Sequence, residues 1–222
     1  MINTRLLLRT ARKLSRGGFT LVELLVVIGI IAILAGVALG PITRGLRTAS
    51  QNAGVQTSRT IAIAEFQYAG DNNQNYPDVS GGTAQNIVRL LLAGNYVSDP
   101  TIFYIGGSAE SKFTGQSAST SITNSNISYD FAGNGGNGIN PNIPDLTPVC
   151  WSSVGTATLA LTGTGPIAVT LVPTMPFGTA GIAVTYKSNS AKFVTQPSGA
   201  PNLCDPAFSG SGTSLNVLTG GG

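Results

Sequence analysis

The side chains that could do chemistry are few. The chain contains no His, which removes Ser/His and Cys/His nucleophile pairs, His-ligated zinc and the usual general base near neutral pH. The carboxylates are scattered and form no recognisable catalytic pair. Some could offer oxygens to Ca²⁺, although they lack the alternating spacing of an EF-hand loop. These are Asp71, Asp78, Asp130 and Asp205. We therefore expect neither an enzyme nor a cofactor, and we assign no metal ligand.

One carboxylate lies in an unusual place. Glu23 is the only charged residue between Phe19 and Leu39, a segment of 21 residues. As a helix this segment would be about 32 Å long, which matches the hydrocarbon thickness of a membrane. An ionised carboxylate inside a membrane costs about 2.5–3.5 kcal/mol, so it is expected to face a partner. Alternatively, Glu23 lies one turn from the helix start, where the helix dipole favours an acid.

The charges before this segment predict its orientation. The first 18 residues hold five bases and no acid, whereas residues 19–222 hold seven bases and nine acids, a net charge of −2. The positive-inside rule therefore places the N-terminus in the cytoplasm and the chain beyond residue 40 outside. The scattered charge of that part favours no nucleic-acid partner. A secretory signal cut near Ala38 is the alternative, although such signals have an apolar core of only about 7–15 residues.

The start of the apolar segment resembles the processing motif of type IV prepilins and type II secretion pseudopilins. The resemblance covers about 25 residues, from a basic leader into an unbroken apolar run. Its matching core is Arg16, Gly17, Gly18, Phe19, Thr20, Leu21, Val22, Glu23 and Leu24. The resemblance implies cleavage between Gly18 and Phe19 and methylation of the new Phe19 amine. It also implies that Glu23 of one copy pairs with the Phe19 amine of the next, which would couple cleavage to assembly.

This resemblance implies a structural subunit of a bacterial type IV pilus or type II secretion pseudopilus. Its partners would be other copies and related pilin-like subunits, the prepilin peptidase and methyltransferase, and an inner-membrane assembly platform. The precursor would cross the inner membrane once, and the head would be periplasmic or extracellular. A monomeric, membrane-anchored binding protein or enzyme is the alternative. The sequence leaves open whether the filament is a surface pilus or a secretion pseudopilus.

The chain beyond the apolar segment continues as a helix. Apolar residues recur at steps of three, four or seven, so residues 41–69 are expected to be amphipathic and helical. Gly40 and Pro41 favour a kink or break between this part and residues 19–40. The expected helix from Phe19 to Ala69 would be about 76 Å long, too long for one small domain to bury.

Residues 70–222 are expected to form a globular antiparallel β head with one short helix over residues 84–93. The predicted fold class is therefore α+β, with a long N-terminal spine packed on the sheet, as in pilins. Short segments rich in Val, Ile, Thr and aromatic residues predict the strands. They are 101–105, 127–131, 156–161, 167–172, 182–186, 192–195 and 214–218. Hairpin turns are expected at 163–166 and 187–190.

Two further features of the head have a structural interpretation. Cys150 and Cys204 are the only cysteines, and outside the cytoplasm they could form a disulfide worth about 2–4 kcal/mol. Two reduced thiols are the alternative. The GNGGNG stretch over residues 133–138 lacks the Lys and Ser/Thr of a phosphate-binding loop, and we interpret it as a flexible loop.

Overall fold

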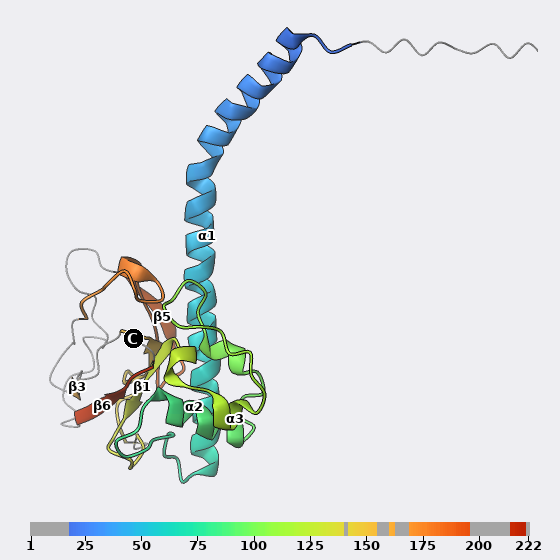
Figure 1. The fold of residues 1–222 in the computed structure, drawn as a ribbon. Helices are drawn as coiled ribbons and strands as arrows, with labels where there is room; N and C mark the ends of the chain where they lie inside the picture. The colour runs from blue at the N-terminus through green and yellow to red at the C-terminus, as the bar shows by residue number, and fades with distance from the viewer. Residues whose placement is uncertain (1–17, 140–141, 155–159, 163–168, 196–213, 221–222) are drawn as a thin grey trace, which may run out of the picture. The chain divides into compact units, whose positions relative to one another are not determined.

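The computed structural model describes residues 18–139, 142–154, 160–162, 169–195 and 214–220. The chain divides into two compact units, residues 1–46 and 47–222. The first unit contains the N-terminal part of helix α1 (Leu21–Asp71), a helix of 51 residues. The second contains the rest of α1 and all of the other elements (Figure 1). The expected spine helix is confirmed, with both of its ends within two residues of the prediction.

The second unit is built on a six-stranded sheet in the order β3-β6-β1-β2-β4-β5. Every pair of neighbouring strands is antiparallel. The strands are β1 (Tyr129–Gly133), β2 (Pro148–Ser152), β3 (Ala160–Thr162), β4 (Gly181–Tyr186), β5 (Ala191–Thr195) and β6 (Ser214–Leu218). The predicted α+β class, a long N-terminal helix packed on an antiparallel sheet, is confirmed.

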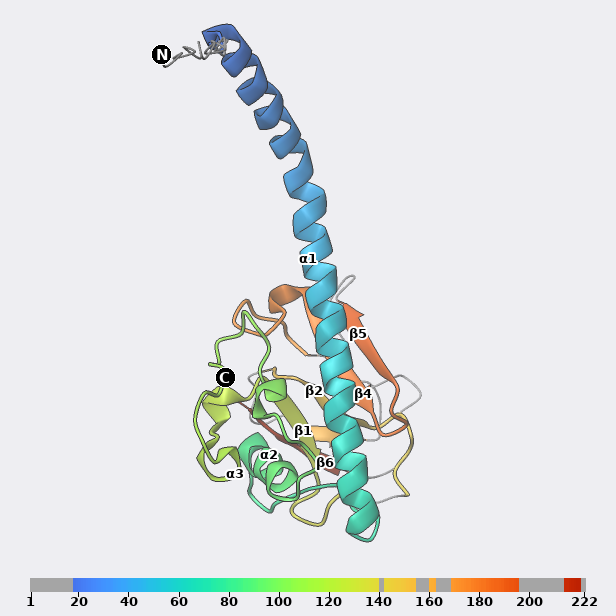
Figure 2. The same ribbon diagram turned by 90° about the vertical axis from the view of Figure 1, so that its right-hand side faces the viewer.

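The part of α1 that follows Arg47 packs against this sheet (Figure 2). Its inward face is made of small and aliphatic residues, of which Ile61 and Ala64 are fully or almost fully buried. Ser58 is also buried, and its Oγ lies 2.8 Å from Thr185 Oγ1 on β4. A close approach is required at Gly54, where an added Cβ would collide with the Phe177 ring. The helix therefore docks through shape as well as through apolar burial.

Short helices cover the other parts of the head. They are α2 (Ala84–Ala93), α3 (Ala118–Ser121), and the 3₁₀ helices η1 (Pro100–Phe103), η2 (Asn124–Asn126) and η3 (Gly178–Ala180). The predicted helix over residues 84–93 is confirmed as α2. Its start is fixed by a capping box between Thr83 and Asn86. Ile87, Val88 and Leu91 lie on one side of α2 and are fully buried, which is the amphipathic pattern the sequence predicts.

Several predicted strands are wrong. Residues 101–105 contain η1 instead of a strand, because Pro100 begins a helical turn and the Asp99 carboxylate accepts from Thr101 N at 2.8 Å. Residues 169–172 form no strand, and 163–168 lie outside the described residues. β3 pairs with β6, and the hairpin turn predicted at 163–166 also lies outside the described residues.

The turn at 187–190 joins β4 to β5 as predicted, with Tyr186 N donating to Ser190 O at 2.9 Å. The strand predicted at 214–218 coincides with β6, and that predicted at 127–131 begins two residues later as β1. Sequence analysis missed β2, although β2 lies between β1 and β4 and is buried along its whole length.

Candidate assembly motif at the start of α1

Gly18 and Phe19, the predicted cleavage pair, lie just before α1 and are both exposed. The leader over residues 1–17 lies outside the described residues. The peptide bond between Gly18 and Phe19 therefore lies in an exposed, non-helical stretch of chain. The cleavage itself, and the methylation of Phe19, stay predictions.

Glu23 has a local role at the helix start that the sequence analysis foresaw only in general terms. Thr20 N and Thr20 Oγ1 each donate to Glu23 Oε2 at 2.8 Å, and Glu23 N donates to Thr20 Oγ1 at 3.2 Å. This reciprocal pattern is a capping box, which satisfies backbone N–H groups that have no partner inside the helix. The sequence signal for this capping box is Thr followed three residues later by Glu.

The capping box leaves part of the carboxylate available. Both of the bonds that Glu23 accepts end on Oε2, and its side chain lies on the exposed surface of the first unit. A second group could therefore approach Oε1 without breaking the cap. The two interpretations of Glu23, a favourable place near the helix start and a partner in another copy, are compatible in this geometry.

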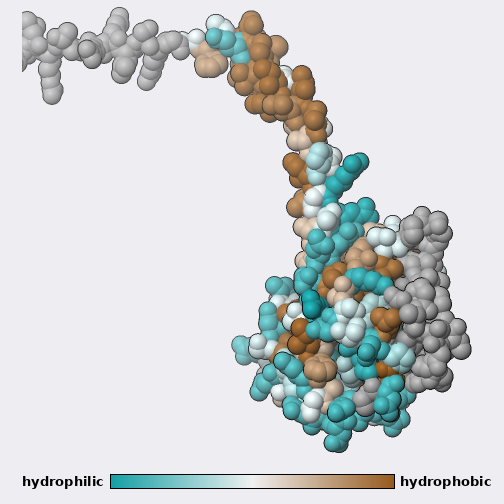
Figure 3. Space-filling model, turned by 180° about the vertical axis from the view of Figure 1, so that it is seen from behind, coloured by the Kyte–Doolittle hydropathy of each residue, from teal (hydrophilic) through white to brown (hydrophobic). Residues whose placement is uncertain are grey.

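The apolar side chains that follow Glu23 are uncovered. The large ones from Phe19 to Leu39 have exposed fractions between 45% for Val27 and 79% for Phe19, and Figure 3 shows this stretch as an almost continuous apolar surface. Exposed apolar surface of this extent is typical of a membrane or protein interface. Among the described residues, α1 is the one helix long and apolar enough to cross a membrane.

α1 passes through Gly40 and Pro41 as a continuous helix, so this structure contains no melted segment there. Pro41 cannot donate to the carbonyl of Val37. Thr43 Oγ1 donates to Leu39 O at 3.1 Å and to Gly40 O at 2.9 Å, which ties the next turn together. A break at Gly40 and Pro41 stays a prediction for the assembled state.

The cysteine and metal assignments are tested only in part. Cys150 is fully buried on β2, and burial raises the pKa of its thiol. Cys204 lies outside the described residues, so the disulfide stays a prediction. Within the described ranges, no three acidic or cysteine side chains are grouped so as to hold a metal ion.

The glycine-rich loop at residues 133–138 has a binding role within the head that the sequence analysis missed. The carboxylate of Asp78 accepts from three of its amides, at 2.7 Å from Asn134 N, 2.8 Å from Gly136 N and 3.3 Å from Gly138 N. Gly136 and Gly138 have φ of 92° and 72°, which turns these N–H groups toward one point. The loop is thus an anion cradle that holds a carboxylate of the same chain.

Asp130 is a second carboxylate that the fold uses internally. It is fully buried on β1, where it accepts from Val154 N and Gly220 N at 2.8 Å each. Burial raises its pKa to about 6, and the bonds from Gly220 and Val154 partly offset that rise. Asp130 therefore joins the chain end to the middle of the sheet. None of its contacts suggests a ligand.

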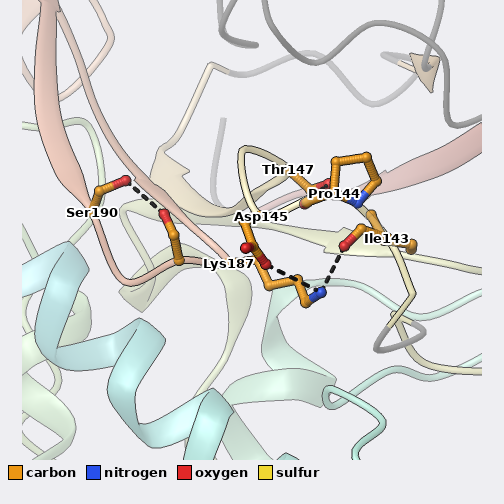
Figure 4. Close-up of polar contacts among 7 residues, drawn as sticks. Ile143, Pro144, Asp145, Thr147, Lys187 and Ser190 are labelled. Atoms are coloured by element: carbon orange, nitrogen blue, oxygen red, sulfur yellow. Dashed lines mark hydrogen bonds and ion pairs between the residues drawn. The ribbon is translucent and has the colours of Figure 1, made fainter.

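Lys187 joins the β4–β5 turn to the segment before β2 (Figure 4). Its Nζ donates to Ile143 O at 2.6 Å and lies 3.6 Å from Asp145 Oδ1. The backbone adds bonds from Lys187 N to Thr147 O at 2.8 Å and from Ser188 N to Asp145 O at 2.9 Å. A cation held by this many contacts positions a loop, and we assign it no chemistry.

Comparison with known proteins agrees with the N-terminal assignment. The family model of the prokaryotic N-terminal methylation motif matches residues 13–39, which include Gly18, Phe19 and Glu23 together with the apolar segment. No curated protein and no solved structure matches the chain. The match supports a precursor that is processed at its N-terminus. The chain thus carries the type IV prepilin-type signature directly before an exposed, membrane-length apolar helix.

Proposed function

We propose that this protein is a structural subunit of a type IV pilus or a type II secretion pseudopilus. One observation carries the proposal: the methylation motif at residues 13–39 lies on an apolar helical segment that nothing else in the described chain covers. A segment of this kind is stable in a lipid bilayer or against copies of itself. A prepilin-like subunit uses both environments, first as a membrane-inserted precursor and then in a filament.

The first step is insertion of the precursor in the bacterial inner membrane. The basic leader keeps the N-terminus in the cytoplasm and the head is exported. A prepilin peptidase then hydrolyses the bond between Gly18 and Phe19 at the cytoplasmic face. Hydrolysis removes five positive charges and creates a free amine on Phe19. Methylation of this amine keeps its positive charge.

The second step is addition of the processed subunit to a filament by an inner-membrane assembly platform. In apolar surroundings the charge of Glu23 is costly unless it is paired. The Phe19 amine of a neighbouring copy would supply that pair by approaching Oε1, while Oε2 keeps its two bonds from Thr20. The amine exists only after cleavage, so an unprocessed precursor cannot make the pair.

Two substitutions distinguish the effect of the Glu23 charge on assembly from the effect of the capping box. Glu23→Gln keeps an oxygen that can accept from Thr20 but removes the charge. Thr20→Val removes the hydroxyl, at a cost of about 1 kcal/mol to the helix start, but keeps the charge. We expect Glu23→Gln to lower the yield of sheared or sedimented filaments at least about tenfold. Thr20→Val should remain within about threefold of wild type.

Mass spectrometry of the N-terminus in each strain shows whether processing is intact. Filaments that form normally with Glu23→Gln would contradict the charge-pair mechanism. Loss with Thr20→Val but not with Glu23→Gln would mean that the cap, and not the charge, is what assembly needs. If the wild-type protein remains monomeric in its host while its apolar segment stays in the membrane, the alternative of a membrane-anchored binding protein or enzyme holds instead.

A further inference from the structure

A second glutamate of α1, Glu65, is buried in the head. Its exposed fraction is 1%, and its Oε2 has no hydrogen-bond partner among the described residues. It lies on the face of α1 that packs against the sheet, far along the chain from the apolar segment of residues 19–40. A buried carboxylic acid without partners is costly, and as a rule it remains only where the surrounding structure tolerates its neutral form.

The surroundings of Glu65 favour the neutral acid. Its neighbours on the same face of α1 include Ile61, Ala62 and Ala69, all buried. The titratable groups that it influences are Tyr76, from the segment after α1, and Cys150 on β2. Neither of these groups is a cation, and burial is the cause that raises the pKa of Glu65.

The pKa shifts of Glu65 and Tyr76 also indicate that these surroundings favour the neutral forms. Burial raises the pKa of Glu65 well above its ordinary value of 4.5. Burial together with the charge of Glu65 and of Asp145 raises the pKa of Tyr76 to about 12. Burial in the docked state therefore disfavours the ionised form of each of these groups. An ionised Glu65 would place a single uncompensated negative charge between α1 and β2.

We propose that Glu65 acts as a proton-dependent latch, which holds α1 on the sheet while its carboxyl is neutral and loosens this contact when the carboxyl ionises. The latch belongs to the head alone and does not depend on filament assembly. It makes the stability of an exported domain sensitive to the pH of its surroundings.

The direction of the effect follows from linkage. In the unfolded chain Glu65 ionises near pH 4.5, whereas in the docked state it keeps its proton to a higher pH. Docking is therefore most stable below about pH 4.5, and it weakens as the pH rises until the folded-state pKa is passed. Over that range one proton is released on unfolding, so the unfolding constant rises about tenfold for each pH unit.

The composition of the chain leaves few other groups that titrate near neutral pH. Because there is no His, no ordinary side chain titrates between about pH 6.5 and 8. Asp130 has a pKa of about 6, so it is mostly ionised in this window. The ordinary pKa values of Cys150 and Tyr76 are 9.0 and 10.0, and burial raises both. A slope in this window therefore reports Glu65.

The test is urea unfolding of the full chain in non-ionic detergent at a series of pH values from about 4.5 to about 8. Trp151 is the only Trp, and it is fully buried on β2, so its fluorescence follows the loss of the sheet to which α1 docks. We expect the wild-type unfolding constant to rise at least about tenfold more than that of Glu65→Gln between these limits, because only the wild type loses the Glu65 proton. Asp145→Asn, at a carboxylate that is 80% exposed, should keep the wild-type slope.

A Glu65→Gln protein whose unfolding constant rises with pH as steeply as that of the wild type would overturn the proposal. If Glu65→Gln does not fold, Glu65→Met serves the same purpose, because an apolar side chain of similar volume often replaces a buried polar group without loss. Amide hydrogen exchange, corrected for its intrinsic pH dependence, localises the effect. Faster exchange at pH 8 should appear first in residues 54–69 of α1.

Discussion

The two parts of α1 have similar secondary structure and opposite surroundings. Before residue 47, every described residue is exposed, including large aliphatic side chains such as Ile33 and Val37. After residue 47, the helix has one buried face that belongs to a sheet-based core. The difference teaches that a continuous helix can present different surfaces along its length: the first part has exposed apolar side chains, and the second part packs on the sheet of the head.

The two glutamates of the helix show the same contrast. Glu23 is exposed and makes a capping box with Thr20, so its charge remains available to a partner. Glu65 is buried with an oxygen that has no partner in the described chain, so its charge is disfavoured. The same residue type therefore caps an exposed helix start in one part of α1 and lies on a buried packing face in the other.

Matched truncations on the two parts should show the largest difference in stability. Ile61 is fully buried, so Ile61→Ala should lower the free energy of unfolding of the head by about 3–4 kcal/mol. Ile33 is 69% exposed in the first unit, so Ile33→Ala should change that free energy by less than about 0.5 kcal/mol. Urea unfolding followed by Trp151 fluorescence measures both, and equal effects would refute the division of α1 into two parts.

A pH effect of similar size should appear in the head through Asp130. Its pKa is about 6 in the fold, raised from 3.8 mainly by burial, so the folded state holds this proton more tightly than the unfolded state. The free energy of unfolding should therefore fall, by about 3 kcal/mol, as the pH rises from about 3 to about 7.

This effect is best measured in the Glu65→Gln protein, because Glu65 titrates in the same direction. Further substitution of Asp130→Asn should flatten the remaining slope, whereas Glu23→Gln should leave it unchanged, since Glu23 lies in the exposed part of α1. A contribution of Asp130 to the free energy of unfolding that rises with pH over this range would contradict its raised pKa.

The smallest effects should come from two glycines of α1. Gly54→Ala forces its methyl group into the Phe177 ring, which also packs edge-on against Phe193 at 5.2 Å between centroids. We expect a loss of about 1–3 kcal/mol in head stability. Gly70→Ala, in the last turn, meets nothing within 4 Å and should raise stability by about 0.5–1 kcal/mol through helix propensity. Thermal unfolding of the two proteins would show opposite shifts, and shifts of the same sign would contradict the close helix–loop contact.

The local patterns of the sequence were sufficient to predict the elements that depend on local physics. The α1 boundaries followed from apolar periodicity and from the turn residues after Asp71. α2 followed from its one-sided aliphatic pattern, and the β4–β5 turn followed from the small polar residues that separate two β-rich segments. The motif around Gly18, Phe19 and Glu23 was readable because its residues are contiguous.

The elements that were missed depend on long-range contacts. β2 is buried on both faces, so its side chains do not alternate between apolar and polar and give no strand periodicity. The pairing of β3 with β6 joins segments more than fifty residues apart. The cradle around Asp78 brings residues 78 and 133–138 together. Glu65 is buried because α1 packs on strands that come much later in the sequence. No local pattern encodes such contacts.

The central claim, that the exposed part of α1 assembles copies after removal of a leader, is tested most directly by intact-mass and N-terminal analysis of the protein from its native cell envelope. The account predicts a chain that begins at Phe19, carries a methylated amine and is recovered in a polymer. A chain that keeps Met1, or one cut near Ala38 and recovered as monomers, would contradict it.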